Sequence, residues 1–340
     1  MSRSTAVYRE RMTRVLIDSF GRRISYVRLS VTDRCDFRCR YCMGERMSFV
    51  PNGQLLSFGE IEALVDLLIA RGVSRVRLTG GEPLVRRGVL DLVERLGRRI
   101  GDGLEELTLT TNGSQLAGAA QRLFASGVRR VNVSLDSRDA ERFAHITRRG
   151  MLDDVLEGIA AAKAAGLGVK INMVALKGIN DDEIEPMLRW CAAEAFGLTL
   201  IETMPLGEVE DERAGHYLPL DGVKRRLEER YSLVPSLART GGPARYYDVT
   251  ELGVQLGLIT PISENFCAGC NRIRISATGT VFGCLGHDQK IELRELLRSG
   301  DVAETESALD ALIAGKPERH RFDIAASAPA VERHMSVTGG

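Results

Sequence analysis

The sequence predicts an α/β fold in which six strands, joined by helices, form an open, partial barrel. Patterns typical of strands alternate with helical patterns from about residue 24 to residue 205, and such alternation indicates a parallel sheet. Six strands are too few to close an eight-stranded barrel of the TIM type. The 340 residues, of which 44% are apolar, suffice for the core of a barrel with a further extension.

The elements follow one another in a regular order. Strands are expected at 24–32, 73–79, 104–111, 128–136, 167–176 and 198–204, with helices between them at 57–71, 88–99, 115–126, 139–165 (interrupted at Gly150) and 181–196. The first helix is the best marked, because Ser57 and Glu60 form a capping box. Beyond Pro205 the alternation stops. There the chain is expected to be irregular over 206–262, apart from a helix near 221–230, with a last helical region at 293–314.

The expected strands have one apolar face and one polar face, since successive side chains of a strand point to opposite sides. Strands of a parallel barrel are usually apolar on both faces. Here five strands of six carry a polar face, and its basic residues are Arg28, Arg75, Arg77 and Lys170. An antiparallel sheet with a wet face would alternate in the same way, but helices stand between the strands. We therefore expect a cationic lumen that holds a phosphorylated ligand.

Charge and hydropathy restrict the partners of the chain. Lys plus Arg equals Asp plus Glu at 46 each, so no global field favours nucleic acid or a membrane surface. No stretch of about 18 apolar residues occurs, and the residues after Met1 form no signal region, so a cytoplasmic location is expected. In that reducing compartment the seven cysteines indicate metal ligands rather than disulfides. Cys191 is the exception, because it lies on an apolar helical stripe.

Three cysteines, called the first trio, follow the first expected strand in a C-x3-C-x2-C pattern: Cys35, Cys39 and Cys42. Thiolates hold iron–sulfur clusters, and a 4Fe–4S cluster with three of them keeps one iron free. A structural zinc site requires four ligands, and no histidine lies near this loop. The spacing resembles that of the radical S-adenosylmethionine (SAM) superfamily.

A glycine motif, Gly80-Gly81-Glu82-Pro83, follows the second expected strand. Its two glycines expose a backbone edge for hydrogen bonding, with a carboxylate beside it. Alone, the motif could be a plain strand-to-helix turn. Downstream of the first trio, it resembles the superfamily's motif for the amino group of SAM.

A second trio of cysteines, spaced C-x2-C-x13-C, consists of Cys267, Cys270 and Cys284. His287 follows closely, so the set could instead hold a tetrahedral zinc ion in a structural or nucleic-acid-binding module. Spacing alone does not separate this zinc site from a second iron–sulfur cluster. The adjacent Arg272 and Arg274, the first trio upstream and the family resemblance described next together favour the cluster.

Over nearly its whole length the chain resembles the GTP 3′,8-cyclase family, also called the molybdenum cofactor biosynthesis protein A family. The resemblance is carried by residues 18–43, 77–83, 110–113, 132–136 and 266–284 and by the terminal Gly339-Gly340. Other radical SAM proteins share the first trio and the glycine motif. The sequence Cys-Asn-Arg-x-Arg, together with the third cysteine of the second trio, occurs in a much narrower group of proteins.

The resemblance implies a partial (β/α)6 barrel of the TIM type in residues 1–205, whose open side is closed by a C-terminal extension in residues 206–340. It implies a 4Fe–4S cluster on each trio, with SAM on the free iron of the first and the guanine of GTP on the free iron of the second. The SAM-binding positions would be Tyr41, Gly81, Glu82, Ser134 and Met204, and the GTP-binding positions Arg28, Arg77, Thr110, Lys170, Arg272 and Arg274. Catalytic roles are implied for Arg28, Arg272, Arg274, Gly339 and Gly340.

The implied reaction is the first step of molybdenum cofactor (molybdopterin) biosynthesis, carried out by a lyase. A 5′-deoxyadenosyl radical takes the hydrogen from C3′ of the ribose, and the C3′ radical adds to C8 of guanine. A second electron and a proton complete 3′,8-cyclo-7,8-dihydro-GTP. The resemblance also implies a homodimer, an electron donor of the flavodoxin or ferredoxin type, and hand-over of product to cyclic pyranopterin monophosphate synthase.

Some positions depart from the family pattern, and some remain open to other interpretations. Thr199 stands where an arginine is common, Asp36 replaces an asparagine, and Gly286-His287 follow Cys284 where an apolar residue is common. A neighbouring arginine could substitute at Thr199. The terminal glycines could be a frayed tail, although their lack of a side chain would also permit close approach to an active site. A radical SAM peptide-modifying enzyme with an auxiliary cluster is an alternative function, but no added segment offers a peptide groove.

Overall fold

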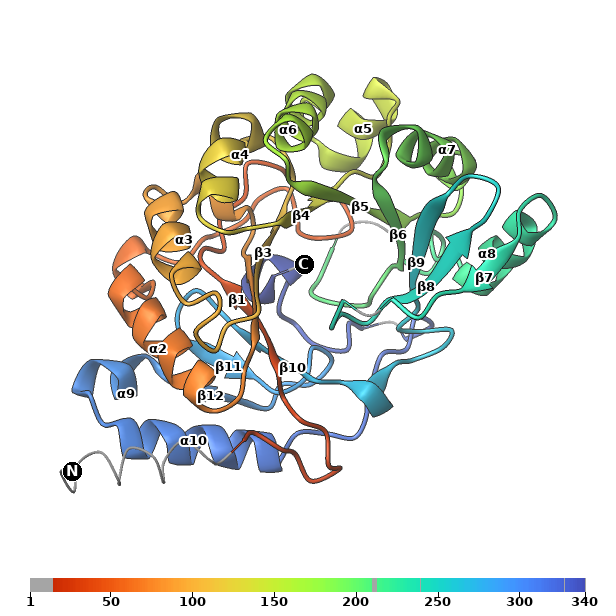
Figure 1. Ribbon diagram of the computed structural model, residues 1–340. Helices are drawn as coiled ribbons and strands as arrows, with labels where there is room; N and C mark the ends of the chain where they lie inside the picture. The colour runs from red at the N-terminus through yellow and green to blue at the C-terminus, as the bar shows by residue number, and fades with distance from the viewer. Residues whose placement is uncertain (1–14, 210–212, 239, 327, 340) are drawn as a thin grey trace.

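The computed structural model describes residues 15–209, 213–238, 240–326 and 328–339. Its strands form one sheet in the order β12-β11-β10-β1-β2-β3-β4-β5-β6-β9-β8-β7. The central strands are β1 (Tyr26–Ser30), β2 (Arg75–Thr79), β3 (Glu106–Thr111), β4 (Arg130–Ser134), β5 (Gly168–Ala175) and β6 (Gly197–Glu202). They pair in parallel in sequence order and curve around a central space (Figure 1). The predicted open, partial barrel is confirmed.

Helices cover the outer face of this curved sheet (Figure 1). They are α2 (Phe58–Ala70), α3 (Val89–Gly97), α4 (Leu116–Ala125), α5 (Ala140–Thr147), α6 (Leu152–Ala164) and α7 (Ile184–Glu194). The capping box of α2 is present, because Ser57 Oγ accepts from the Glu60 N–H at 3.2 Å and Glu60 accepts from the Ser57 N–H at 2.5 Å. The expected interruption at Gly150 separates α5 from α6, and a Cβ there would lie only 2.8 Å from the Phe143 ring.

The packed core lies between the sheet and the helices. The apolar faces of the first two strands, with Val27, Leu29, Val76 and Leu78, are fully buried. Each such side chain contributes about 1.5–3 kcal/mol when it is removed from water. The polar faces of the same strands point the other way, into the barrel. The sheet is therefore stabilised from outside, which leaves its inner face available for ligands.

The extension was only partly predicted. It contains α8 (Leu220–Glu228), β7 (Leu233–Pro235), β8 (Arg245–Val249) and β9 (Val254–Ile259), followed by β10 (Arg272–Ile275), β11 (Thr280–Phe282) and β12 (Lys290–Glu292). The expectation that 206–262 is irregular apart from one helix was wrong. β9 pairs in parallel with β6, and β8 and β7 add to it antiparallel. These strands form because they pair with an edge of the sheet that is distant in sequence, and their own alternation of polar and apolar residues does not predict them.

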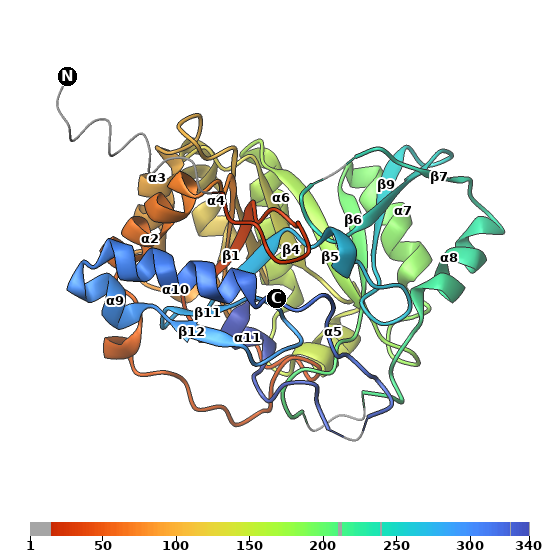
Figure 2. The same cartoon turned by 90° about the horizontal axis from the view of Figure 1, so that it is seen from below.

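The extension lengthens the sheet at both edges, since β10 pairs in parallel with β1. Three short 3-10 turns lie in the loops: η1 (Asn52–Gln54), η2 (Pro83–Val85) and η3 (Cys267–Gly269). The last helices are α9 (Arg294–Ser299), α10 (Val302–Ala314) and α11 (Met335–Thr338), which lie on the side of the molecule that carries β11 and β12 (Figure 2). The expected helical region at 293–314 is split at Gly300, whose φ is +73°. No helix in the described part of the chain is long and apolar enough to cross a membrane.

Candidate active site

The polar faces of the strands line a cavity of about 250 Å³. This is several times the ~30 Å³ that one water occupies in the liquid. The predicted site residues that line it are Arg28, Cys35, Cys39, Tyr41, Cys42, Arg77, Gly81, Thr110, Ser134, Lys170, Met204, Cys267, Cys270, Arg272, Arg274 and Cys284. The fold thus brings both trios and the basic strand residues to one hollow, although they are up to about 250 positions apart in sequence.

The first trio lies on the loop that leaves β1, beside the glycine motif. The Gly81 N–H donates to Thr32 O and the Glu82 N–H donates to Arg34 O, both at 2.8 Å. A Cβ on Gly81 would lie 2.6 Å from Arg34 C and 2.7 Å from Asp33 O. Glycine is therefore required for the motif to pack against the cysteine loop.

Gly81→Ala is expected to displace the cysteine loop at a cost of about 1–3 kcal/mol, because the added methyl group has no space. Affinity for SAM should fall by about tenfold or more, since 1.4 kcal/mol is a factor of ten. Equilibrium dialysis of SAM and iron analysis of the same samples would measure both effects. Gly118→Ala is the matched control, because nothing lies within 4 Å of a Cβ at that position in α4. Unchanged SAM affinity in Gly81→Ala would contradict the prediction.

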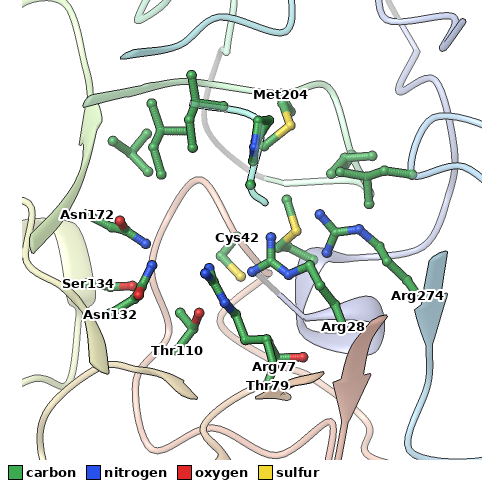
Figure 3. A pocket seen from close by; sticks show the side chains of 18 of the residues that line it. Arg28, Cys42, Arg77, Thr79, Thr110, Asn132, Ser134, Asn172, Met204 and Arg274 are labelled. Carbon is green, nitrogen blue, oxygen red and sulfur yellow. The ribbon is translucent and has the colours of Figure 1, made fainter. Parts of the chain in front are cut away.

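Three arginines stand in register on adjacent strands. Arg28 on β1 pairs with Arg274 on β10 and with Arg77 on β2, and neighbouring strands lie about 4.8 Å apart. Their guanidinium groups reach into the same hollow, with Cys42 behind them (Figure 3). Each is at most 9% exposed, and none has an ion pair with a carboxylate of the described chain. The Nε atoms of Arg28 and Arg77 have no hydrogen-bond partner.

This row of arginines is electrostatically uncompensated. Burial, followed by repulsion from Arg274 and Arg77, lowers the pKa of Arg28 well below its ordinary value. Burial and the charge of Arg272 lower the pKa of Arg274 to about 9. A polyanion in the cavity would relieve both effects and satisfy the unpaired donors.

Lys170 on β5 continues the cationic lining. Its ammonium donates to the Tyr246 hydroxyl, lies 4.1 Å from the centroid of the Tyr246 ring, and has a pKa lowered to about 7 by burial and by Arg130 and Arg77. Thr199 lies opposite Gly257, and its Oγ1 is buried without a partner. A Cβ on Gly257 would lie 2.9 Å from both Thr199 Oγ1 and Tyr246 Cε1. Gly257 therefore leaves no room for a larger side chain between Thr199 and Tyr246.

The second trio faces the same cavity from the loop before β10 and the end of β11. Within the described ranges, no three His, Cys, Asp or Glu side chains converge on a point where one metal ion could bind. His287 does not line the cavity, and its Nε2 lies 3.0 Å from Arg319 O. The histidine that would complete the zinc alternative therefore lies off the cavity wall that the three cysteines share. A cluster binds its thiolates through separate irons, so its ligands need not converge on one point.

The two trios differ in their electrostatic surroundings. Burial and then the carboxylate of Glu82 raise the pKa of the Cys35 thiol, and burial raises that of Cys42 to about 11. Burial also opposes ionisation of Cys270, but the charges of Arg272 and Lys316 outweigh it and lower the pKa of this thiol to about 7. All six thiols are free, and thiolates are the form that binds metal.

The C-terminal tail returns to the first trio. The Ser336 N–H donates to the Cys42 thiol. Arg274 Nη1 donates to Gly339 O and, at 3.2 Å, to Thr338 O. Gly339 has φ +77°, and a Cβ there would overlap the Thr79 hydroxyl. Gly340, predicted as a catalytic residue, lies outside the described residues.

Three predicted residues do not line the cavity. Arg75 forms an ion pair with Glu105 at 3.0 Å, so its expected place in the lumen was wrong. Glu82 is fully buried, accepts from the Asn112 N–H at 2.6 Å and from Thr111 Oγ1 at 2.9 Å, and has a pKa raised to about 7 by burial. It therefore joins the glycine motif to the end of β3 and does not face the cavity. Gly339 does not line the cavity, but its carbonyl accepts a hydrogen bond from Arg274, which does.

Sequence reasoning missed several residues that line or support the site. Tyr246 binds Lys170, Ser336 binds Cys42, and Lys316 lies 3.5 Å from Cys270 Sγ. All of them belong to the extension and come to the site only through long-range folding. The local pattern at Lys316-Pro317 indicates only the end of a helix, so it does not predict a role in the site.

The fold and the site define a radical SAM enzyme. The family model described as Radical SAM superfamily matches residues 29–191, and the model described as Molybdenum Cofactor Synthesis C matches residues 196–322. The crystal structure of Streptococcus suis SuiB bound to S-adenosylmethionine has the same fold, with a TM-score of 0.60 at 15% identity over 98% of this chain and 80% of that chain.

Closer relatives identify the family. The GTP 3′,8-cyclase of Erythrobacter litoralis (strain HTCC2594) is 56% identical over 96% of this chain and 98% of its own length. The GTP 3′,8-cyclase of Sinorhizobium medicae (strain WSM419) is 54% identical over 96% of this chain and 95% of its own length. The GTP 3′,8-cyclase of Bradyrhizobium diazoefficiens is 52% identical over 100% of both chains. The chain belongs to the GTP 3′,8-cyclase family.

Proposed function

We propose that the protein converts GTP to (8S)-3′,8-cyclo-7,8-dihydroguanosine 5′-triphosphate, the first step of molybdenum cofactor biosynthesis. The observation that carries the proposal is a cavity lined by two trios of free cysteines, with a row of buried arginines beside them that form no ion pair with a carboxylate of the described residues. Relatives that are 52–56% identical over nearly the whole chain support the same activity.

The first trio would hold a 4Fe–4S cluster, and Tyr41, Gly81, Ser134 and Met204 would surround SAM. When bound, the reduced cluster and SAM together supply the 5′-deoxyadenosyl radical. Free thiols at the cavity wall and the buried, unpartnered hydroxyl of Thr79 on the same wall fit these groups, and Gly81 lines the cavity beside them. The second trio would hold a second 4Fe–4S cluster close to the guanine. Its free thiols on the same cavity support this assignment.

Arg28, Arg77, Arg274, Arg272 and Lys170 would bind the triphosphate and ribose of GTP, and Thr110 would add a hydroxyl partner. Buried guanidinium groups bind phosphate oxygens through paired N–H donors and are already fixed by the sheet. The protein would thereby hold the ribose C3′ and the base C8 in one orientation. Such positioning alone can lower a barrier by several kcal/mol, about 7–11 in favourable cases.

Affinity for GTP is expected to decrease as pH rises from 6 to 8.5. Burial lowers the pKa of Lys170 to about 7, so most of its ammonium is protonated at pH 6 and most is neutral at pH 8.5 in the free protein. Loss of this cation weakens attraction for phosphate. Binding of GTP by the SAM-free protein, measured by calorimetry at each pH, would show the trend. In Lys170→Met the affinity should be lower at pH 6 and nearly independent of pH, and a pH trend equal to that of the parent would refute the role of Lys170.

The proposal is tested by incubating the reduced, anaerobic protein with SAM and either GTP or ATP. GTP should be consumed to the cyclic product with cleavage of SAM, whereas ATP should not be cyclised. If GTP were untouched while SAM cleavage depended on an added peptide, the alternative of a peptide-modifying enzyme would replace the proposal. Metal analysis should give about eight iron and about eight sulfide ions per chain for two clusters.

Further parts of the proposal are predictions. The division into a barrel of residues 1–205 and an extension of residues 206–340 follows from the end of the strand–helix alternation at Pro205. A homodimer and an electron donor of the flavodoxin or ferredoxin type follow from the family alone. Hand-over of product to cyclic pyranopterin monophosphate synthase and a cytoplasmic location also remain predictions.

A further inference from the structure

Each cysteine of the second trio is held by a cation from a distant segment. Arg22 Nη1 donates to Cys267 O at 2.9 Å, and Arg333 Nη2 donates to Cys284 O at 3.1 Å. Lys316 Nζ lies 3.5 Å from the sulfur of Cys270. Arg22 and Arg333 thus bind the backbone, whereas Lys316 reaches a thiol itself.

Lys316 is a buried cation that has no carboxylate partner among the residues that the structure describes. The side chain follows α10 and is 2% exposed. Its ammonium donates to Gly283 O, lies 3.3 Å from Arg272 O, and forms no ion pair within the described part of the chain. Burying an uncompensated charge costs several kcal/mol, so an anion is expected close to it. The groups available to carry that negative charge are the cysteine sulfurs of the second trio.

The position of Lys316 is fixed by its neighbours. Arg22 donates to the carbonyls of Pro317 and Glu318, both at 2.6 Å, with the same guanidinium group that holds Cys267. Asp18 in turn binds Arg22 Nε at 2.6 Å, and both side chains of this pair are buried. A turn near the start of the described chain therefore clamps the segment of Lys316 against the second trio. The ammonium is preorganised rather than free to move into solvent.

We propose that Lys316 is a positioning residue of the second metal centre, where its ammonium supplies a fixed positive charge and an N–H···S hydrogen bond to the ligand Cys270. The inference rests on the proposed function, because it requires a cluster on the second trio. Hydrogen bonds to sulfur and nearby net charge set the reduction potentials of iron–sulfur clusters. A cation at Cys270 stabilises the reduced, more negative state, so it raises the potential of this centre relative to the same centre without the charge.

The test uses the full chain with Cys35→Ser, Cys39→Ser and Cys42→Ser, so that only the second centre is loaded. Lys316→Met removes the charge at similar length, Lys316→Arg keeps it, and Lys290→Met removes an exposed lysine of β12 as the matched control. Redox titration followed by electron paramagnetic resonance should show a lower midpoint potential for Lys316→Met. We expect about a tenfold change in the one-electron equilibrium constant, about 59 mV. Lys316→Arg and Lys290→Met should remain close to the parent.

Thermal unfolding gives a readout independent of redox. The loss caused by Lys316→Met should be larger in the cluster-loaded protein than in the metal-free protein, because the charge acts on the cluster. Loss of the cluster from Lys316→Met but not from Lys316→Arg would also support the inference. An unchanged potential with equal destabilisation in both states, or cluster loss from both variants, would show a packing role and overturn it. A parent that binds no cluster on the second trio would instead refute the proposed second centre, and the inference with it.

Discussion

Replacing Cys267, Cys270 and Cys284 together by serine is expected to abolish cyclisation of GTP while iron falls from about eight to about four per chain. The second trio lies on its own segments of the extension, so its removal leaves the loop of the first trio intact. Cleavage of SAM should persist, since Tyr41, Gly81 and the first trio are unchanged. Formation of the cyclic product should fall by at least about a thousandfold, because in the proposed function the second centre positions the base.

Cys191→Ala is the matched control for this experiment. Cys191 is fully buried in the core on α7 and lies outside the cavity. Its replacement removes a thiol and some stability but should leave iron and sulfide at the parent level. Retention of cyclisation in the triple serine variant would contradict the prediction. One zinc per chain in the parent, lost together with the second trio, would restore the zinc module as the better interpretation.

The barrel could be predicted because its pattern is local. In β1 and β2 the residues of one face are apolar, and amphipathic helices, of which α2 and α5 carry side-chain caps, separate the strands. The cationic cavity followed from the same alternation, since Arg28 and Arg77 occupy the face opposite to Val27 and Val76. The same alternation led to a wrong prediction for Arg75. This residue shares the polar face, but it lies at the start of β2 and forms an ion pair with Glu105. Position along a strand decides whether a side chain reaches the cavity, and alternation carries no information on this point.

The extension could not be predicted in the same way. β8 reads Arg-Tyr-Tyr-Asp-Val, which has no clean alternation, and it becomes a strand because β9 offers a paired edge. Tyr246 lies in β8 and Lys316 follows α10, and each contributes to the site through a contact across the fold. Residues whose role depends on long-range pairing leave no local signal. This is why the cysteines could be recognised and the cations that hold them could not.

Gly339→Ala is expected to reduce GTP cyclisation by about a hundredfold or more, in the range found when one preorganised contact to a reacting group is removed. Gly339 lies between Arg274, which donates to its carbonyl, and Thr79, whose hydroxyl a Cβ would overlap. Its φ of +77° is also unfavourable for alanine. The tail would be displaced, and Arg274 would lose the partner that orients it beside Arg28. Both clusters should remain, because neither trio is altered.

Gly300→Ala separates the two causes of this effect. Gly300 has a similar φ of +73°, but nothing lies within 4 Å of a Cβ there, so the variant has the backbone strain without the collision. It should lose about 1 kcal/mol of stability and keep full activity. Steady-state cyclisation, iron content and thermal unfolding of the two variants would be compared. If Gly339→Ala cyclised GTP at the parent rate, the tail would have no part in catalysis, and its contact with Arg274 would serve only to fix the end of the chain. If Gly339→Ala lost both iron and activity, the tail would act by retaining the first cluster through Ser336 and Cys42, a different role from the one expected here.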